Sequence, residues 1–183
     1  MKTFKSAYFS SEQPTVCALG CFDGVHIGHV RLISEARKIA TSLSALSAVW
    51  SFAEPPRNYF STERVPLITT PDEKRKQMQK LGVDIFVSVP TDKETLSLSA
   101  EDFFCEILIK RMNSRHIVCG YNYRFGKGGK GDTALLEKLC KANQIGLSVI
   151  PEVRIGEMAV SSSEVRIPTE QSIFACSIDP LMS

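Results

Sequence analysis

Two histidines stand three residues apart in the glycine-rich stretch GCFDGVHIGH, which separates an apolar run from a helical pattern. This position puts His26 and His29 on one face at the start of a helix. A helix N-terminus offers unpaired N–H groups and a positive dipole end, which together bind phosphate. Two imidazoles beside such a site can donate hydrogen bonds to a phosphorus centre or to a leaving pyrophosphate. Close backbone approach to a ligand is allowed by Gly20, Gly24 and Gly28.

A second loop with the composition of a binding site follows another apolar run, at residues 120–132 (GYNYRFGKGGKGD). Its aromatic rings offer flat faces to a ring system, and the Asn122 amide offers directional hydrogen bonds. Lys127 and Lys130 are either phosphate contacts or members of a solvated basic loop.

A third stretch, VSSSEVR at residues 160–166, places hydroxyls at a predicted helix start. Ser161 and Glu164 have the spacing of a capping box, which predicts one turn of helix there. Ser162, Ser163 and Arg166 would then form an anion clamp.

Alternating strands and helices must position these three stretches. Period-two and continuous apolar runs predict strands at 15–19, 46–52, 83–89, 116–120 and 146–153. Apolar spacing and capping residues predict helices at 30–43, 71–80, 99–112 and 133–142. This alternation favours an α/β, Rossmann-like, open and mostly parallel sheet with helices on both faces. Since ligands bind beyond the carboxyl ends of such strands, we expect the three stretches to share one pocket.

The composition of the chain argues against several classes of protein. The 183 residues carry a net charge of +2, which is too balanced for a protein that binds nucleic acid or anionic lipid. No apolar run approaches the ~18 residues of a membrane span, and the N-terminus lacks the apolar region of a secretory signal. The six cysteines form no CxxC pair and no zinc spacing, so we expect buried reduced thiols and a cytoplasmic location. We expect one domain, with a core at about 14–167 and a tail at 168–183.

The first stretch resembles the HxGH signature of the nucleotidyltransferase superfamily. Its longer form, GxFDGVHxGH, resembles the FMN adenylyltransferase module of bacterial bifunctional riboflavin kinase/FAD synthetases. The second stretch is similar to that family's G-x-N/D-F-x-F-G-x₄-G loop, and the third to its I-S-S-T-x-I-R motif. The resemblance implies transfer of AMP from ATP to FMN, giving FAD and pyrophosphate. We expect the chain to lack that family's riboflavin kinase module, so a separate riboflavin kinase is the expected metabolic partner.

The resemblance also implies roles for individual residues. Catalysis would rest on His26, His29 and Arg166. ATP would contact Gly20, Phe22, Asp23, Gly24, His26, Gly28, His29, Ser162, Ser163 and Arg166. FMN would contact Asn122, Tyr123, Phe125 and Pro56. Mg²⁺ would enter with ATP, and no protein residue is assigned to it.

One stretch departs from the family pattern. Where the family reads T-F-x-P-H-P, this chain has Glu54-Pro55-Pro56 after Phe52, so a histidine is absent and a carboxylate is present. Two alternatives therefore stay open. One is an HxGH nucleotidyltransferase with another phosphorylated acceptor, and the other is a non-catalytic regulator that binds flavin or nucleotide.

Overall fold

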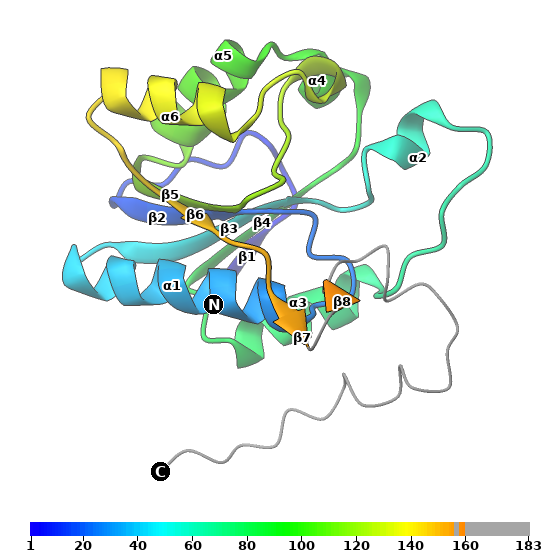
Figure 1. Ribbon diagram of the computed structural model, residues 1–183, viewed down its shortest axis with the longest axis horizontal. Coiled ribbons are helices and arrows are strands. Elements are labelled where there is room, and N and C mark those ends of the chain that lie inside the picture. The colour runs from blue at the N-terminus through cyan, green and yellow to red at the C-terminus, as the bar shows by residue number, and fades with distance from the viewer. Residues whose placement is uncertain (156–157, 160–183) are drawn as a thin grey trace.

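A six-stranded parallel sheet forms the centre of the computed structural model, which describes residues 1–155 and 158–159 (Figure 1). The order of strands across the sheet is β1-β4-β3-β2-β5-β6, and every neighbouring pair is parallel. The strands are β1 (Lys2–Phe4), β2 (Thr15–Leu19), β3 (Leu46–Phe52), β4 (Ile85–Val89), β5 (Ser114–Gly120) and β6 (Gly146–Ile150). The predicted Rossmann-like fold is confirmed.

The strand order creates a switch point beside β2. From β2 the chain moves outward to β3 and β4, and it then returns to place β5 on the other side of β2. The connections after β2 and β5 therefore leave the sheet in opposite directions. A crevice at the carboxyl ends of these strands is the usual ligand site of such sheets.

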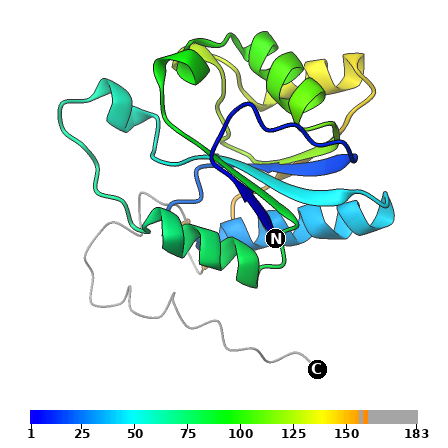
Figure 2. The same cartoon turned by 180° about the vertical axis from the view of Figure 1, so that it is seen from behind.

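Helices cover both faces of the sheet (Figures 1 and 2). One face carries α1 (Ile27–Ser42) and α3 (Pro71–Lys80), and the other carries α5 (Ala100–Asp102), the π-helical segment η1 (Phe103–Arg111) and α6 (Thr133–Ala142). Strand β2 is buried along its whole length, and its side chains alternate between two cores. Val16 and Ala18 pack on the α1 side, while Cys17 and Leu19 pack on the η1 side.

Side-chain caps fix the predicted helix starts. Thr70 and Glu73 form a reciprocal capping box at α3, with proline at the first helical position. Ser99 caps α5, and Asp132 caps α6 by accepting a hydrogen bond from the Leu135 N–H at 2.9 Å. These starts agree with the predictions.

Several elements differ from the sequence-based expectations. Helix α1 begins at Ile27, three residues early, because His26 supplies its cap. Strand β6 ends at Ile150, before Pro151, which has no N–H for a strand ladder. The expected helical turn at 161–166 lies outside the described residues. Elements without a sequence prediction are β1, α2 (Arg57–Phe60), α4 (Lys93–Ser97), η2 (Lys127–Gly129), β7 (Arg154–Ile155) and β8 (Met158–Ala159).

The cysteines largely follow the prediction. Cys17, Cys119 and Cys140 are buried, and burial raises the pKa of the first two to about 12 and of the third to about 11, which keeps them as thiols. Two cysteines are exceptions, because Cys105 lies exposed on η1 and Cys21 is half-buried. Cys176 lies outside the described residues.

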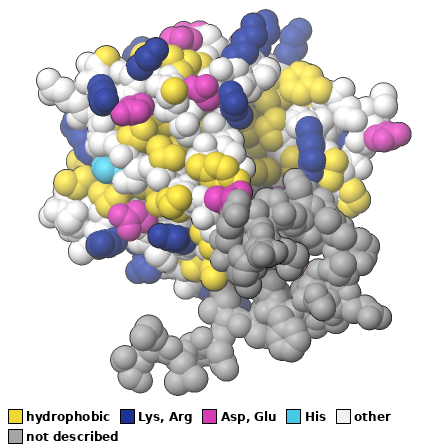
Figure 3. Space-filling view, in the orientation of Figure 1, with side chains coloured by type: hydrophobic (Ala, Val, Ile, Leu, Met, Phe, Trp, Pro, Cys, Tyr) yellow, Lys and Arg dark blue, Asp and Glu magenta, His cyan; other side chains and the backbone are white. Residues whose placement is uncertain are grey.

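Charged side chains are dispersed over the surface. In Figure 3, basic and acidic groups are interspersed on the face shown, and neither sign forms one large patch. Among the described residues, no helix combines the length and the apolar character needed to cross a membrane.

Candidate active site

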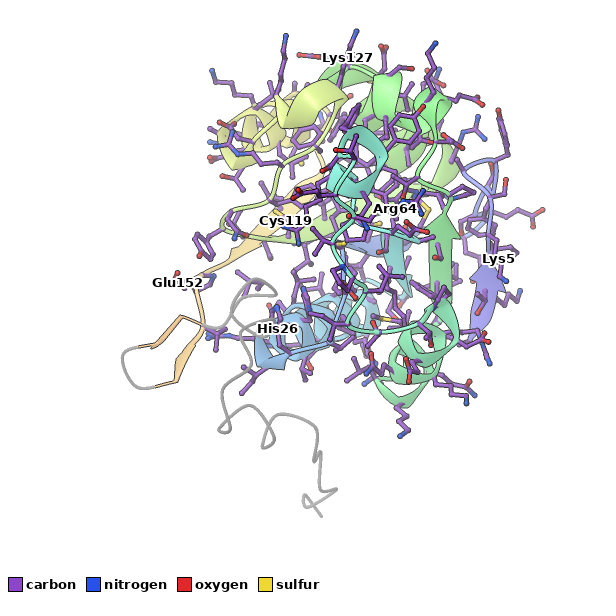
Figure 4. All side chains as sticks on the ribbon, turned by 90° about the vertical axis from the view of Figure 1, so that its right-hand side faces the viewer. Lys5, His26, Arg64, Cys119, Lys127 and Glu152 are labelled. Carbon is purple, nitrogen blue, oxygen red and sulfur yellow. The ribbon has the colours of Figure 1, made fainter. Side chains whose placement is uncertain are left out.

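A cavity of about 360 Å³ opens at the carboxyl ends of the central strands. It brings together the first two sequence motifs, the end of β3 and the segment that leaves β6 (Figure 4). The residues that line it are Leu19, Gly20, Cys21, His26, Gly28, His29, Leu32, Trp50, Phe52, Pro56, Gly120, Tyr121, Asn122, Tyr123, Arg124, Ile150, Pro151, Glu152 and Val153.

The histidine pair lies at the N-terminus of α1. The Nδ1 atom of His26 accepts a hydrogen bond from the His29 backbone N–H at 3.4 Å, so Nε2 is the protonated nitrogen of His26. The two rings stack with their centroids 3.7 Å apart and their planes 20° apart. The Nδ1 atom of His29 is buried and has no hydrogen-bond partner among the described residues. A buried polar atom of this kind is suited to contact a ligand.

Burial keeps both imidazoles neutral in the free protein. Desolvation lowers the pKa of His29 to about 3, and the neighbouring His26 lowers it further, against a hydrogen bond with the Gly24 backbone. Desolvation also lowers the pKa of His26. The Nε2–H of His26 is therefore a neutral donor at pH 7, and a bound anion would favour protonation of the pair.

Phe22 and Asp23 shape this loop from behind and do not line the cavity. Phe22 is fully buried with a positive φ of 50°, and its ring would lie 3.0 Å from a Cβ atom placed on Gly20. The buried carboxylate of Asp23 accepts hydrogen bonds from the N–H groups of Ile68 at 2.9 Å and Thr69 at 3.1 Å. The loop is thus fastened to the segment that precedes α3.

Lys74 and Ser51 support the site, although the sequence analysis gave them no role. Lys74 is 1% exposed, and its ammonium donates to the backbone oxygens of Cys21 at 3.0 Å and Phe52 at 3.2 Å. The Ser51 hydroxyl also donates to the Cys21 oxygen, at 2.9 Å. A signal existed, because Lys74 shares the buried face of α3 with Met78 at i, i+4 spacing.

Two of the three residues predicted in the second motif lie at the cavity. Asn122 and Tyr123 line the cavity, whereas Phe125 is 5% exposed and belongs to the core. The Phe125 ring lies parallel to that of Tyr123, with centroids 5.9 Å apart, so it supports the cavity wall from behind. Lys127 and Lys130 do not line the cavity, which favours the solvated-loop alternative. Figure 4 shows Lys127 at the top of the view, well above His26.

The end of β3 supplies an apolar wall. Trp50, Phe52 and Pro56 line the cavity. Glu54, the unexpected carboxylate, lines a second cavity of about 400 Å³ that also contains Lys5 and Arg64. The departure from the family pattern thus falls outside the main cavity.

The third motif cannot be placed in the same way. Ser162, Ser163 and Arg166 lie outside the described residues. Among the residues that are described, no group of three or more His, Cys, Asp or Glu side chains is arranged to hold a metal ion.

Comparisons with known proteins agree with this geometry. The sequence profile of the family named FAD synthetase matches residues 9–164. A bifunctional riboflavin kinase/FMN adenylyltransferase of Bacillus subtilis (strain 168) is 30% identical over 154 residues, which cover 83% of this chain and 48% of that protein. The chain therefore spans about half the length of this curated relative.

Solved structures show the same architecture. A crystal structure titled macrolide-efflux protein, from Streptococcus pneumoniae, has a TM-score of 0.77 at 27% identity and covers 90% of this chain and 54% of that chain. Pantothenate synthetase from Thermus thermophilus has a TM-score of 0.61 at 13% identity, covering 96% of this chain and 71% of that one, and it shows a shared fold alone. Since the profile match covers most of the chain, including the histidine motif (residues 20–29) and the asparagine loop (residues 120–132), the protein belongs to the FAD synthetase family.

Proposed function

We propose that the protein is an FMN adenylyltransferase, which transfers AMP from ATP to FMN and gives FAD and pyrophosphate. The observation that carries this proposal is one cavity that joins the stacked histidines at a helix N-terminus to two separate walls. One wall is the end of β3, and the other follows β5 and β6. Family membership supports the same reaction.

The FMN phosphate is the nucleophile in this proposal. Its second ionisation lies near pH 6, so it is already a dianion at pH 7 and needs no general base. One of its oxygens forms a bond to the α-phosphorus of ATP. The bond from that phosphorus to the oxygen that bridges the α- and β-phosphorus breaks, and this oxygen leaves with pyrophosphate. The task of the protein is then to align two anions and to stabilise the charge that develops.

The neutral histidines suit this task. The Nε2–H of His26, together with His29 and the first N–H groups of α1, can donate to the reacting phosphates. As the phosphates enter, their charge raises the pKa of both imidazoles and strengthens these donors. In the remaining assignments, ATP contacts Gly20 and Gly28, its phosphates contact Ser162, Ser163 and Arg166, and the flavin contacts Asn122, Tyr123 and Pro56.

Mg²⁺ fits this site as a companion of ATP. Glu152 is the one carboxylate among the described residues that line the cavity, so the protein offers no cage of acidic ligands there. A cation held mostly by phosphate oxygens and water suits this donor set. When bound, it would neutralise charge on the leaving pyrophosphate.

We also propose a cytoplasmic location, with FMN supplied by phosphorylation of riboflavin.

A panel of substrates tests this function. Purified protein with Mg²⁺ is given ATP or CTP with FMN, phosphopantetheine or another phosphorylated acceptor, and the products are separated by chromatography. We expect rapid product formation with ATP and FMN alone. A preference for another pair would identify a different nucleotidyltransferase, and FMN binding without any product would identify a regulator.

A further inference from the structure

Lys74 is a buried cation whose hydrogen bonds all go to the backbone. Its Nζ atom donates to the carbonyl oxygens of Cys21 and Phe52, and a third oxygen, that of Ala53, lies at 3.5 Å. Across the described residues, no carboxylate oxygen lies within ion-pair distance of this ammonium. A buried charge that lacks a bonded counter-ion is costly to a fold, so its presence calls for a reason beyond stability.

The carbonyls that Lys74 binds belong to two different segments that line the cavity. Cys21 lies in the histidine loop after β2, and Phe52 is the last residue of β3. Both residues line the cavity. One ammonium therefore joins the loop proposed to bind ATP to the wall proposed to bind flavin.

The position of Lys74 on its helix favours the attraction of anions. Lys74 lies in the first turns of α3, where the positive end of the helix dipole adds to its own field. In a partly desolvated site, a positive charge attracts phosphate over several ångströms without direct contact.

We propose that Lys74 is a positioning residue, which holds the two substrate walls together and supplies a fixed positive charge beneath the phosphates of ATP and FMN. This inference rests on the proposed function. The side chain would then have two effects on binding. Its charge acts on phosphorylated ligands alone, whereas its backbone contacts affect the binding of every ligand of the cavity.

Pairs of ligands that differ in their phosphates test the charge directly. Equilibrium binding of ATP, adenosine, FMN and riboflavin is measured by calorimetry for the wild type and for Lys74→Met. Lys76→Met is the matched control, because it removes the same charge from an exposed position on the same helix. We expect Lys74→Met to weaken binding of all four ligands through loss of the backbone contacts, and to weaken binding of ATP and FMN by about tenfold more than binding of adenosine and riboflavin. We expect Lys76→Met to change the binding of none of the four.

The outcomes separate this inference from the proposed function. If the wild type binds neither ATP nor FMN, the proposed function is wrong. If the wild type binds both, and Lys74→Met weakens all four ligands alike or none of them, the role of the charge is refuted.

A titration of the wild type decides the question if Lys74→Met does not fold. Desolvation lowers the pKa of Lys74, against smaller opposing effects of Cys21 and Asp23. Raising the pH from about 8 to the usual pKa of lysine, roughly 10.4, should therefore weaken ATP binding while adenosine binding stays constant. Among the titratable neighbours Asp23, His29 and Cys21, only a thiol ordinarily loses its proton in this range, so Cys21→Ser serves as the control. An ATP-to-adenosine ratio that is independent of pH would contradict the proposal.

Discussion

At the scale of single residues, the site depends on imidazoles that are kept neutral by burial. An exposed histidine near a phosphate would be partly charged at pH 7, whereas the low pKa of His29 keeps its ring neutral until an anion arrives. The stacking of His26 on His29 acts in the same direction, because two adjacent rings resist simultaneous protonation. The spacing of the two residues was readable from the sequence, but their stacking and their pKa values depend on Phe22 and the strand ends beneath them.

Removal of His29 tests its catalytic role. We expect His29→Ala to keep the fold and to lower the turnover of ATP and FMN on the order of 10²–10³-fold, as is typical for loss of one donor to a transition state. His116→Ala is the control, because the third histidine lies on β5, where it bonds Ser148 and does not line the cavity. Turnover is followed by chromatography and the fold by circular dichroism. Near-normal turnover of His29→Ala would remove this histidine from the mechanism.

The same residue predicts a dependence of stability on pH. The pKa of His29 is about 3 in the folded protein and roughly 6.5 when unfolded, so between these values the unfolded chain binds a proton that the folded chain does not. The free energy of unfolding should therefore fall as the pH falls through this range, by up to about 1.4 kcal/mol per pH unit.

Urea unfolding at about pH 6.5 and about pH 5 measures this effect. We expect His29→Gln to lose up to about 2 kcal/mol less than the wild type over this interval, since it lacks the titrating group. Equal losses in the two proteins would show that the His29 ring is already accessible to protons in the folded state.

At the scale of elements, the sequence predicts features that depend on neighbouring residues, but it does not predict features that depend on tertiary contacts. The capping box of Thr70 and Glu73 fixed the start of α3 in advance, because both partners lie within four residues. At the end of η1 the Met112 N–H donates to the Ile107 oxygen, five residues back, as in a π-helix. No comparable local pattern in the sequence predicts this geometry. Strand β1 also escaped prediction, because its three residues are stabilised as an edge strand by pairing with β4.

Two glycines of the asparagine loop predict how tightly this loop is fixed. Both have positive φ, 71° at Gly126 and 65° at Gly128. A Cβ atom on Gly126 would lie 2.6 Å from the backbone of Ala100, whereas one on Gly128 meets nothing within 4 Å. We expect Gly128→Ala to cost about 1 kcal/mol of unfolding free energy from backbone strain, and Gly126→Ala to cost more than about 3 kcal/mol because the clash adds to it. Thermal unfolding compares the two, and equal costs would mean that the loop can move away from Ala100.

At the scale of the whole molecule, the strand order explains why residues far apart in sequence share one cavity. Because β2 lies between β3 and β5, the loop that holds His26 and His29 faces both the β3 wall and the asparagine loop. The alternation of strands and helices predicted the sheet, and the placing of motifs at strand ends predicted the shared cavity for the first two. The sequence pattern did not predict that the Phe125 side chain lies in the core, because this position depends on packing against Phe103.

The reaction itself is the most direct test of this arrangement. Wild-type protein is incubated with FMN, ATP and Mg²⁺, and FAD and pyrophosphate are quantified together by ³¹P NMR. A cavity that aligns the FMN phosphate with the α-phosphorus of ATP predicts equal amounts of the two products, which increase together with time. Hydrolysis of ATP without FAD, or an unchanged mixture in which both substrates are bound, would contradict the account.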